Sequence, residues 1–187
     1  METRECIKNR RSIRNFTEQE ITGDVLSELL EAVRWSPSWA NTQCWELVVV
    51  KDHAKKEKLA ELLADRNPAT KAVTQAPLVI VFCGKKGKAG YKKGTPVTEK
   101  GDWYMFDLGI ACQNFCLAAH DMGLGTVQVG SFDHQGVNKL LGVPADVESV
   151  AIIPVGYPAK ESTAPPRKEI NEFVYLDNYG NNLETLG

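Results

Sequence analysis

The order of hydrophobic patterns along the chain predicts a sheet covered by helices, of the α/β or α+β class. Segments with helical periodicity alternate with short β-branched apolar runs, in the order α, β, α, β, α, β, α, β. The chain has 187 residues, of which 43% are hydrophobic and 25% charged. This length suits one substantial core rather than two, so we expect a single domain over residues 1–187.

The first predicted helix covers about residues 23–35. Thr22 is available as its N-cap, and Pro37 ends the run because proline cannot continue a helix. The apolar residues that recur with helical period are Val25, Leu26, Leu29, Leu30 and Val33.

Four segments read as strands. Glu46–Val50 and Leu78–Phe82 are short runs rich in β-branched residues, which is typical of buried strands. Between them, His53–Leu63 is polar with leucines on one face, which predicts an amphipathic helix. Thr126–Val129 and Val147–Val155 are the two later strands.

Two more helices are predicted in the second half. Tyr104–Met122 is long and carries small residues on more than one side, so it is either central or at a subunit interface. Gly123 ends it. Gln135–Leu141 is a short helix behind Asp133.

Two segments are expected to be irregular and on the surface. Residues 84–101 combine glycines with a run of lysines, and residues 157–169 contain three prolines. The lysines of the first segment that lie before residue 94 are Lys85, Lys86, Lys88, Lys92 and Lys93.

Composition excludes several classes of partner. A formal net charge of −2 gives no general attraction to nucleic acid or anionic membranes, and no apolar run approaches the roughly 20 residues of a membrane span. The five cysteines form no C-x-x-C pair, and we interpret Cys112 and Cys116 as small buried residues rather than a metal or redox pair. We expect a cytoplasmic protein that binds neither nucleic acid nor membranes.

Several catalytic signatures are missing. The sequence has no P-loop, H-E-x-x-H, G-x-S-x-G or strand-to-helix G-x-G-x-x-G, so a dinucleotide resident in a Rossmann crevice is not expected. His53, His120 and His134 have no paired cysteine or carboxylate pattern and are assigned no role. We predict no catalytic side chain and no metal site.

Residues 10–16 are the candidate phosphate receptor. Three arginines and a serine lie within five residues, and arginine binds phosphate oxygens bidentately without losing its charge. Ser12 and Arg14 alternate along an extended strip, so both can face one phosphate, while Phe16 anchors the strip in the core.

Four motifs, in order, resemble the FMN-dependent nitroreductase family. They are Arg-Arg-Ser-x-Arg-x-Phe at 10–16, Ser-Pro-Ser-x-x-Asn-x-Gln at 36–43, the helix from Asp107 to the Gly-Leu-Gly at 123–125, and Val-Gly-Tyr-Pro at 155–158. The resemblance covers nearly the whole chain. It implies an α+β fold with a central, mostly antiparallel sheet flanked by helices, and a homodimer that holds FMN in two clefts at its interface.

The resemblance also implies the cofactor-binding residues. The strip for the phosphate, the ribityl chain and the pyrimidine edge is Arg10, Arg11, Ser12 and Arg14, and Arg14 supplies the charge near the pyrimidine carbonyl. The loop that reaches the flavin of the partner subunit is Pro37, Ser38, Trp39, Asn41 and Gln43. The strand end against the flavin face is Gln128, Val129, Gly130 and Ser131. Arg167 closes on the phosphate, and Lys71 is a weaker candidate.

The activity that the resemblance implies is a ping-pong cycle. NADH or NADPH passes hydride to FMN and leaves, and a nitroaromatic, quinone or similar small-molecule acceptor then takes the electrons. Two alternatives stay open: a specialised enzyme of the same fold, either dehalogenase-like or flavin-degrading, with residues 84–101 as its lid, or a protein that binds FMN without turnover.

Three roles are also left open. Trp39 is either a lid on the cofactor pocket or an anchor of the dimer interface. Trp103 and Tyr104 either shape the mouth for substrate or fix the long helix. The lysines of residues 84–101 either attract the 2′-phosphate of NADPH or an acidic substrate, or are a solvated loop.

Overall fold

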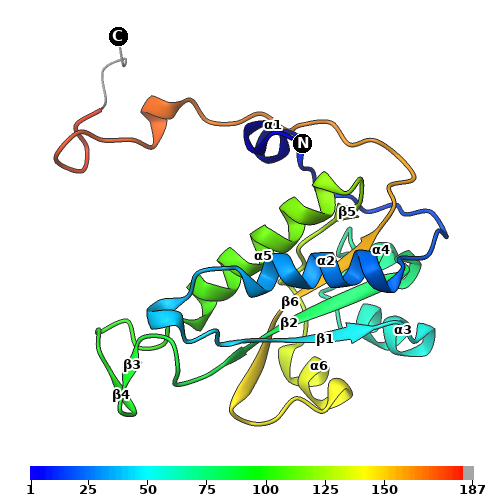
Figure 1. Cartoon of the computed structure of the whole chain (residues 1–187), viewed down its shortest axis with the longest axis horizontal. Helices are drawn as coiled ribbons and strands as arrows, with labels where there is room; N and C mark the ends of the chain where they lie inside the picture. Colours follow the sequence, from blue (N-terminus) through cyan, green and yellow to red (C-terminus); the bar gives the residue numbers. More distant parts are fainter. Residues whose placement is uncertain (183–187) are drawn as a thin grey trace.

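An antiparallel sheet lies at the centre of the protein (Figure 1). The computed structural model describes residues 1–182, so residues 183–187 of the predicted domain lie outside the described part. The strands are β1 (Trp45–Val50), β2 (Leu78–Lys85), β5 (Gly125–Thr126) and β6 (Val147–Gly156), and their spatial order is β1-β2-β6-β5. All three pairings are antiparallel, which confirms the α+β class with a mostly antiparallel sheet.

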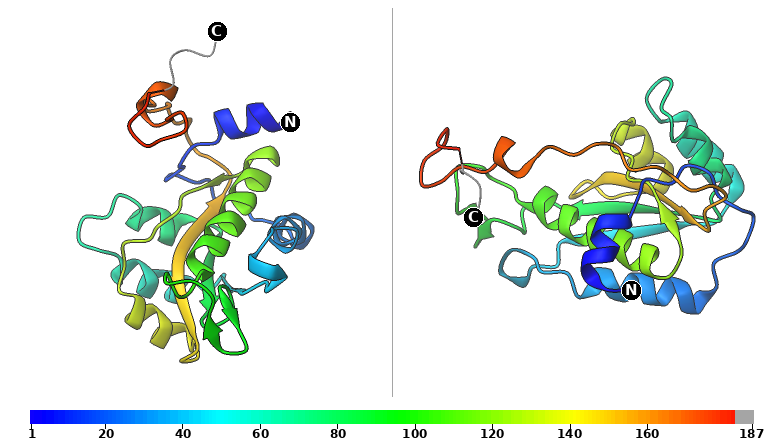
Figure 2. Two further views of the ribbon diagram at one scale, coloured as in Figure 1. Left: turned by 90° about the vertical axis from the view of Figure 1, so that its left-hand side faces the viewer. Right: turned by 90° about the horizontal axis from the view of Figure 1, so that it is seen from above.

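Helices cover both faces of the sheet (Figure 2). One face carries α2 (Gly23–Arg34) and α5 (Tyr104–Asp121), and the other carries α3 (His53–Glu61), α4 (Thr70–Gln75) and α6 (His134–Leu141).

Strand β2 shows why helices pack on both faces of the sheet. Its first seven residues are all buried, and alternate side chains enter opposite cores, as a period of two requires. Ile80 and Phe82 join the cluster under α2 and α5, while Val79 and Val81 join the cluster under α3, α4 and α6.

The predicted helix ends are confirmed at two N-caps. The Thr22 hydroxyl accepts a hydrogen bond from the Val25 amide at 3.4 Å. The Asp133 carboxylate accepts from the Gly136 amide at 3.0 Å. Each cap satisfies a backbone donor that the first helical turn cannot pair internally.

The predicted strand over 126–129 is wrong in its extent. The regular strand β5 ends at Thr126, and pairing with β6 returns only at the Val129–Ile152 bridge. The register is continuous, so Val127 lies opposite Pro154. Proline has no amide hydrogen to donate, which interrupts the ladder at that pair.

Residues 84–101 are more regular than expected. Strand β2 extends to Lys85, and β3 (Tyr91–Lys92) pairs with β4 (Thr95–Pro96) as a small hairpin. The interpretation of this segment as irregular is therefore wrong at its centre.

The remaining short elements lie near the termini and in the loops. Two helices were not foreseen, α1 (Thr3–Asn9) and α4; both are short, and neither has a side-chain N-cap. The 3-10 turns are η1 (Trp39–Asn41) and η2 (Ile170–Glu172). Residues 158–169 are exposed and without helix or strand, close to the irregular segment predicted there. Among the described residues, no helix combines the length and apolar character that crossing a membrane requires.

Candidate functional site

The strip at residues 10–16 runs beside β5. The Ile13 amide donates to the Thr126 carbonyl at 2.9 Å, and Ser12 forms a parallel bridge with Thr126. Ile13 and Phe16 are buried, which confirms Phe16 as the anchor. Because side chains alternate along extended backbone, Ser12 and Arg14 lie on the side opposite Ile13.

The Arg11 guanidinium has a different environment. It donates to the carbonyls of Lys8 and Arg10 at 2.7 and 2.8 Å, at the C-terminal end of α1. Arg11 therefore stabilises the helix end that precedes the strip. Together with Arg10 it also lines a pocket of about 560 Å³ that includes Thr126 and Lys160.

The pocket contains a group that the sequence did not single out. The Nε2 atom of His120 is buried and has no hydrogen-bond partner among the described residues. Burial lowers the pKa of His120, and the charges of Arg10 and Arg11 lower it further. The imidazole is therefore held in its neutral form beside two guanidinium groups, with one ring nitrogen available for a further partner. His120 lies on α5 and belongs to no recognised histidine, cysteine or carboxylate motif, so the sequence alone did not single it out.

Residues 128–131, the predicted strand end, come shortly after β5, the strand beside which the strip runs. Val129 is buried, and its amide and carbonyl both bond to Ile152 at 3.0 and 2.9 Å. Gln128, Gly130 and Ser131 are exposed. Within residues 1–182, the amides of Gly130 and Ser131 donate to no backbone carbonyl. This end of the strand thus has two exposed residues whose backbone N–H groups can donate to solvent or to a ligand.

Asn67 helps to hold Ser131, the last residue of this segment. The Ser131 carbonyl accepts from the Ala64 amide at 3.0 Å and from Asn67 Nδ2 at 3.3 Å. Lys71, the weaker candidate, is exposed in the first turn of α4, four residues after Asn67. The structure therefore brings together the strip, the strand end and this amide, all along one edge of the sheet.

The loop at residues 37–43 is strained and firmly held. Ala40, Asn41 and Gln43 all have positive φ, at 44°, 56° and 47°. Such backbone costs free energy and persists where the surroundings impose it. The Gln43 amide donates to Ser38 Oγ at 2.9 Å, and the Gln43 side-chain amide donates to Asn41 Oδ1 at 3.2 Å.

A buried carboxylate fixes the same loop from α5. Asp107 is only 1% exposed, and both its oxygens accept from the Trp39 amide at 3.1 Å. Cys44 Sγ donates to Asp107 Oδ2 at 3.5 Å. The Trp39 ring packs on Trp103 with centroids 5.1 Å apart. Asp107 is thus the residue that sets the position of the loop, and it was not recognised from the sequence.

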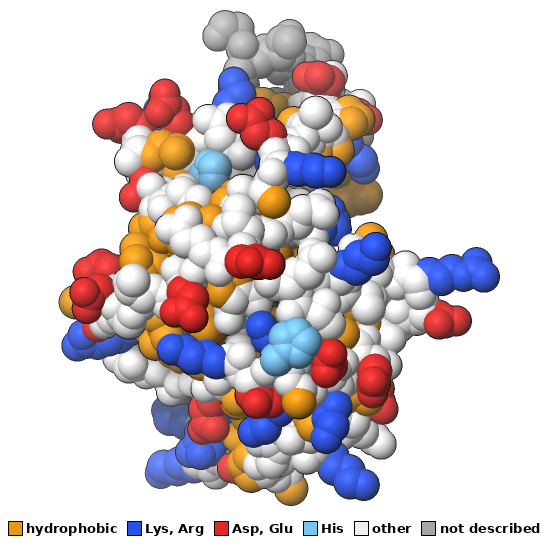
Figure 3. Space-filling view, turned by 90° about the vertical axis from the view of Figure 1, so that its right-hand side faces the viewer, with side chains coloured by type: hydrophobic (Ala, Val, Ile, Leu, Met, Phe, Trp, Pro, Cys, Tyr) orange, Lys and Arg blue, Asp and Glu red, His pale blue; other side chains and the backbone are white. Residues whose placement is uncertain are grey.

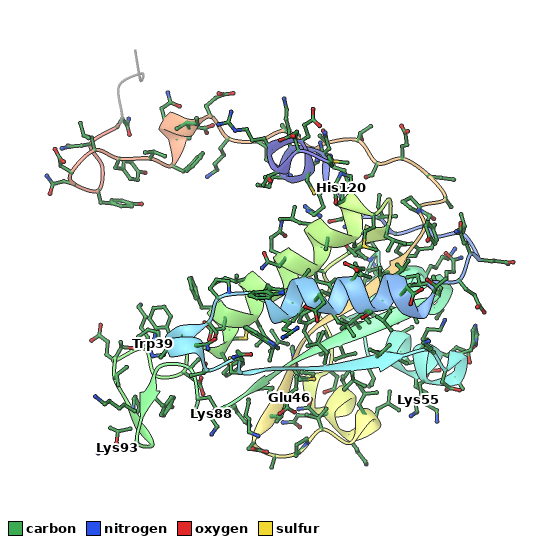
Figure 4. The ribbon with its side chains drawn as sticks, viewed as in Figure 1. Trp39, Glu46, Lys55, Lys88, Lys93 and His120 are labelled. Atoms are coloured by element: carbon green, nitrogen blue, oxygen red, sulfur yellow. The ribbon has the colours of Figure 1, made fainter. Side chains whose placement is uncertain are left out.

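Within one chain the loop and the strip do not meet. Trp39 lies near the start of α5 and His120 near its end, so the two lie at opposite ends of the helix (Figure 4). Eighteen residues of helix span about 27 Å. Arg167 also stands apart: it is exposed on the segment after β6 and donates to the Pro165 carbonyl at 3.5 Å.

A larger hollow of about 750 Å³ lies elsewhere, lined by residues of α3 and of the segment 16–21. It contains none of the predicted site residues. Lys56, its buried cation, donates to the Ala76 carbonyl at 2.7 Å and so caps the end of α4. On the neighbouring surface, acidic and basic side chains are interspersed (Figure 3). The buried cation of the hollow is already hydrogen-bonded within the protein, so it is not available to an anionic ligand.

Comparison with known proteins identifies relatives over almost the full length. Residues 7–157 match the model of the Nitroreductase family. An FMN reductase (NADPH) of Bacillus subtilis is 30% identical over 187 residues, which cover 94% of this chain and 73% of the relative. A second protein of that organism, FMN reductase [NAD(P)H], is 28% identical over 193 residues, covering 95% and 74%.

A solved structure agrees with these matches. The FMN-dependent nitroreductase from Clostridium difficile R20291 superposes with a TM-score of 0.79 at 26% identity. The alignment covers 95% of this chain and the whole of that one. The match therefore extends over both core clusters and the edge that carries the strip.

Proposed function

The chain belongs to the nitroreductase family, and on that premise we propose that it is an FMN-dependent oxidoreductase reduced by NADH or NADPH. The observation that carries the proposal is the pairing of Ser12 and Ile13 with Thr126. This pairing supports the proposal because the cationic strip then lies beside β5, which leads to the Gly130 and Ser131 amides, and these amides donate to no carbonyl of the described residues. The proposed site takes its residues from between positions 10 and 131 and adds Arg167, and residues 1–187 act as one domain.

The residues on this edge fit FMN. A flavin mononucleotide needs cations for its phosphate and donors for the polar edge of its ring. Arg10 and Ser12 would hold the phosphate and ribityl chain, and the pocket beside them offers His120 Nε2, which has no hydrogen-bond partner within residues 1–182. Arg14 would face the pyrimidine carbonyl, and the Gly130 and Ser131 amides would donate to the ring. When bound, FMN accepts a hydride and passes its electrons on.

The protein's part in this chemistry is binding and electrostatics. A positive charge at Arg14 stabilises the negative charge that a reduced flavin carries. Asn67 holds the Ser131 carbonyl, which fixes the direction of the neighbouring amides. No side chain of the described site is needed as an acid, since the acceptor can take its proton from solvent. We propose nitroaromatics, quinones and similar conjugated molecules as acceptors, and the cytoplasm as the location.

A homodimer completes the site in this proposal. The 37–43 loop and the 10–14 strip lie at opposite ends of α5, so a two-fold axis that pairs two α5 helices antiparallel would bring the loop of each chain to the strip of the other. Residues 158–182 carry exposed apolar side chains suited to a second chain: Ile170, Phe173 and Leu176. Arg167 on this segment would reach the phosphate only after such docking.

Two measurements test the proposal. Initial rates with NADPH and a quinone varied together should give parallel double-reciprocal lines, the signature of ping-pong kinetics.

The double variant Arg10→Ala with Arg14→Ala should give a folded protein that purifies without FMN. The matched control is Arg4→Ala with Arg34→Ala, which removes two exposed arginines elsewhere. Stoichiometric FMN in the first double variant would count against the assigned site.

A further inference from the structure

Positive charge is concentrated in residues 84–101 of this chain. Residues 84–101 hold six lysines and one acidic residue, Glu99, which gives the segment a charge of +5. The whole chain carries −2, so the remainder carries −7. Only one of the six, Lys85, forms an ion pair within the described residues, at 3.8 Å from both Glu46 and Asp146. The other five have no ion-pair partner among residues 1–182, and their mutual repulsion opposes folding.

Lys92 and Lys93 lie on an ordered hairpin formed by β3 and β4, and Lys88 lies in the turn that precedes it. Lys93 and Gly94 have φ of +50° and +79°, and they form the two-residue turn between β3 and β4. At the base, the Val97 amide donates to the Gly90 carbonyl at 2.8 Å. A Cβ on Gly90 would collide with the Trp103 ring and with the Gly101 carbonyl, so this contact is close. The ammonium groups are therefore displayed at fixed backbone positions.

The hairpin is joined to the loop of the proposed flavin site. Trp103 Nε1 donates to Thr98 Oγ1 at 3.0 Å, and the Trp103 amide donates to the Ala89 carbonyl at 3.0 Å. The same indole packs on Trp39 and, at 5.6 Å between centroids, on the exposed ring of Phe106. Figure 4 shows Trp39, Lys88 and Lys93 at the same end of the molecule. The aromatic cluster of Trp39, Trp103 and Phe106 thus lies at the same end of the molecule as lysines that form no ion pair within the described residues.

We propose that Lys88, Lys92 and Lys93 bind the phosphate-bearing adenosine end of the reductant and so favour NADPH over NADH. A purine ring can stack on the Trp103–Phe106 pair, and a 2′-phosphate suits ammonium groups that have no ion-pair partner in the described part of the chain. In the proposed homodimer, the 37–43 loop reaches the flavin cleft of the partner subunit. The hairpin, which is joined to this loop, then lies at the mouth of that cleft. This inference rests on the proposed function, because it assigns the substrate specificity of that same site.

A binding experiment tests the inference without turnover. The triple variant Lys88→Gln, Lys92→Gln and Lys93→Asn removes the charges, and asparagine tolerates the positive φ at position 93. Calorimetric titration of the FMN-loaded protein with adenosine 2′,5′-bisphosphate should show about tenfold weaker binding in this variant, since each exposed ammonium–phosphate pair contributes modestly. Titration with 5′-AMP should change much less. The control is Lys55→Ala with Lys58→Ala on the exposed side of α3, which should bind like the parent protein.

Turnover distinguishes this inference from the proposed function. With one neutral quinone as acceptor, the triple variant should lose about tenfold in kcat/KM for NADPH, through KM, and little for NADH. Equal losses for both nucleotides, or no loss, would overturn the lysine assignment alone. A loss seen only when a neutral acceptor is replaced by an anionic one would overturn it too and assign the lysines to the acceptor. A parent protein whose flavin neither nucleotide reduces would overturn the proposed function as well.

Discussion

Gly125→Ala is the sharpest test of how the strip is held. A Cβ at position 125 would lie 2.6 Å from the Ile13 Cβ, where ordinary contacts begin near 3.4 Å. Rotation of the Ile13 side chain does not move its Cβ, so the backbones of the strip and of β5 must separate by about 1 Å. The hydrogen bond from the Ile13 amide to Thr126, now 2.9 Å long, would then exceed hydrogen-bonding distance.

The expected effects follow from this separation. Forcing one methyl group into a closely packed contact costs about 1–3 kcal/mol. For a protein of this size, each kcal/mol lowers the melting temperature by roughly 2–4 °C, so a decrease of about 2–12 °C is expected. The shift also moves Ser12 and Arg14 away from the strand end, so FMN should bind at least about tenfold more weakly.

Thermal melting of the apoprotein, followed by circular dichroism, measures the first effect. Quenching of FMN fluorescence during titration measures the second. Gly23→Ala is the matched control, because no atom lies within 4 Å of the added Cβ. The reasoning is refuted if Gly125→Ala melts within about 1 °C of the parent protein and binds FMN equally well.

Three further predictions concern other parts of the structure. Asp107→Ala leaves the Trp39 amide without its acceptor, so urea denaturation should show a loss of about 1–3 kcal/mol; an unchanged midpoint would contradict this. Burial, and then the hydrogen bond to Glu148, raises the pKa of Tyr104 to about 12, so its contribution to stability is lost as the pH rises from about 10 through 12. Tyr104→Phe should flatten that part of the pH–stability curve, and equal slopes would refute the assignment. Burial raises the pKa of Cys44 to about 12 and of Cys83 to about 11, so both thiols should react with a thiol reagent at neutral pH only in denaturant.

Much of the fold could be predicted because the pattern alone is decisive in long amphipathic or wholly apolar segments. Helices α2, α3, α5 and α6 and strands β1, β2 and β6 occur close to their expected bounds. Helices α1 and α4 could not be predicted, since each is short, lacks a side-chain cap and depends on tertiary packing. The end of β5 could not be predicted, because it depends on Pro154 in the neighbouring strand.

For the candidate site, the motifs could be recognised in the sequence, but their arrangement in space is known only from the structure. Residue order alone shows neither that residues 10–14 lie beside residues 126–131 nor that the 37–43 loop lies at the far end of α5. Asp107 and His120 were missed because the partners of Asp107 lie more than 60 residues away in the sequence, and because the role of His120 depends on one buried nitrogen without a partner among the described residues. The loop with three positive-φ residues is also invisible in the sequence, since Ala40 and Gln43 are not residues that favour this backbone.

Anaerobic titration of the purified, FMN-reconstituted protein tests the central claim most directly. The visible flavin absorbance should bleach on addition of NADPH or NADH and return on addition of a nitroaromatic or quinone. A flavin that stays oxidised with both nucleotides would contradict the proposed oxidoreductase, and a reduced flavin that only oxygen reoxidises would favour a binding protein without turnover. Failure to bind FMN at all would contradict the whole assignment of the site.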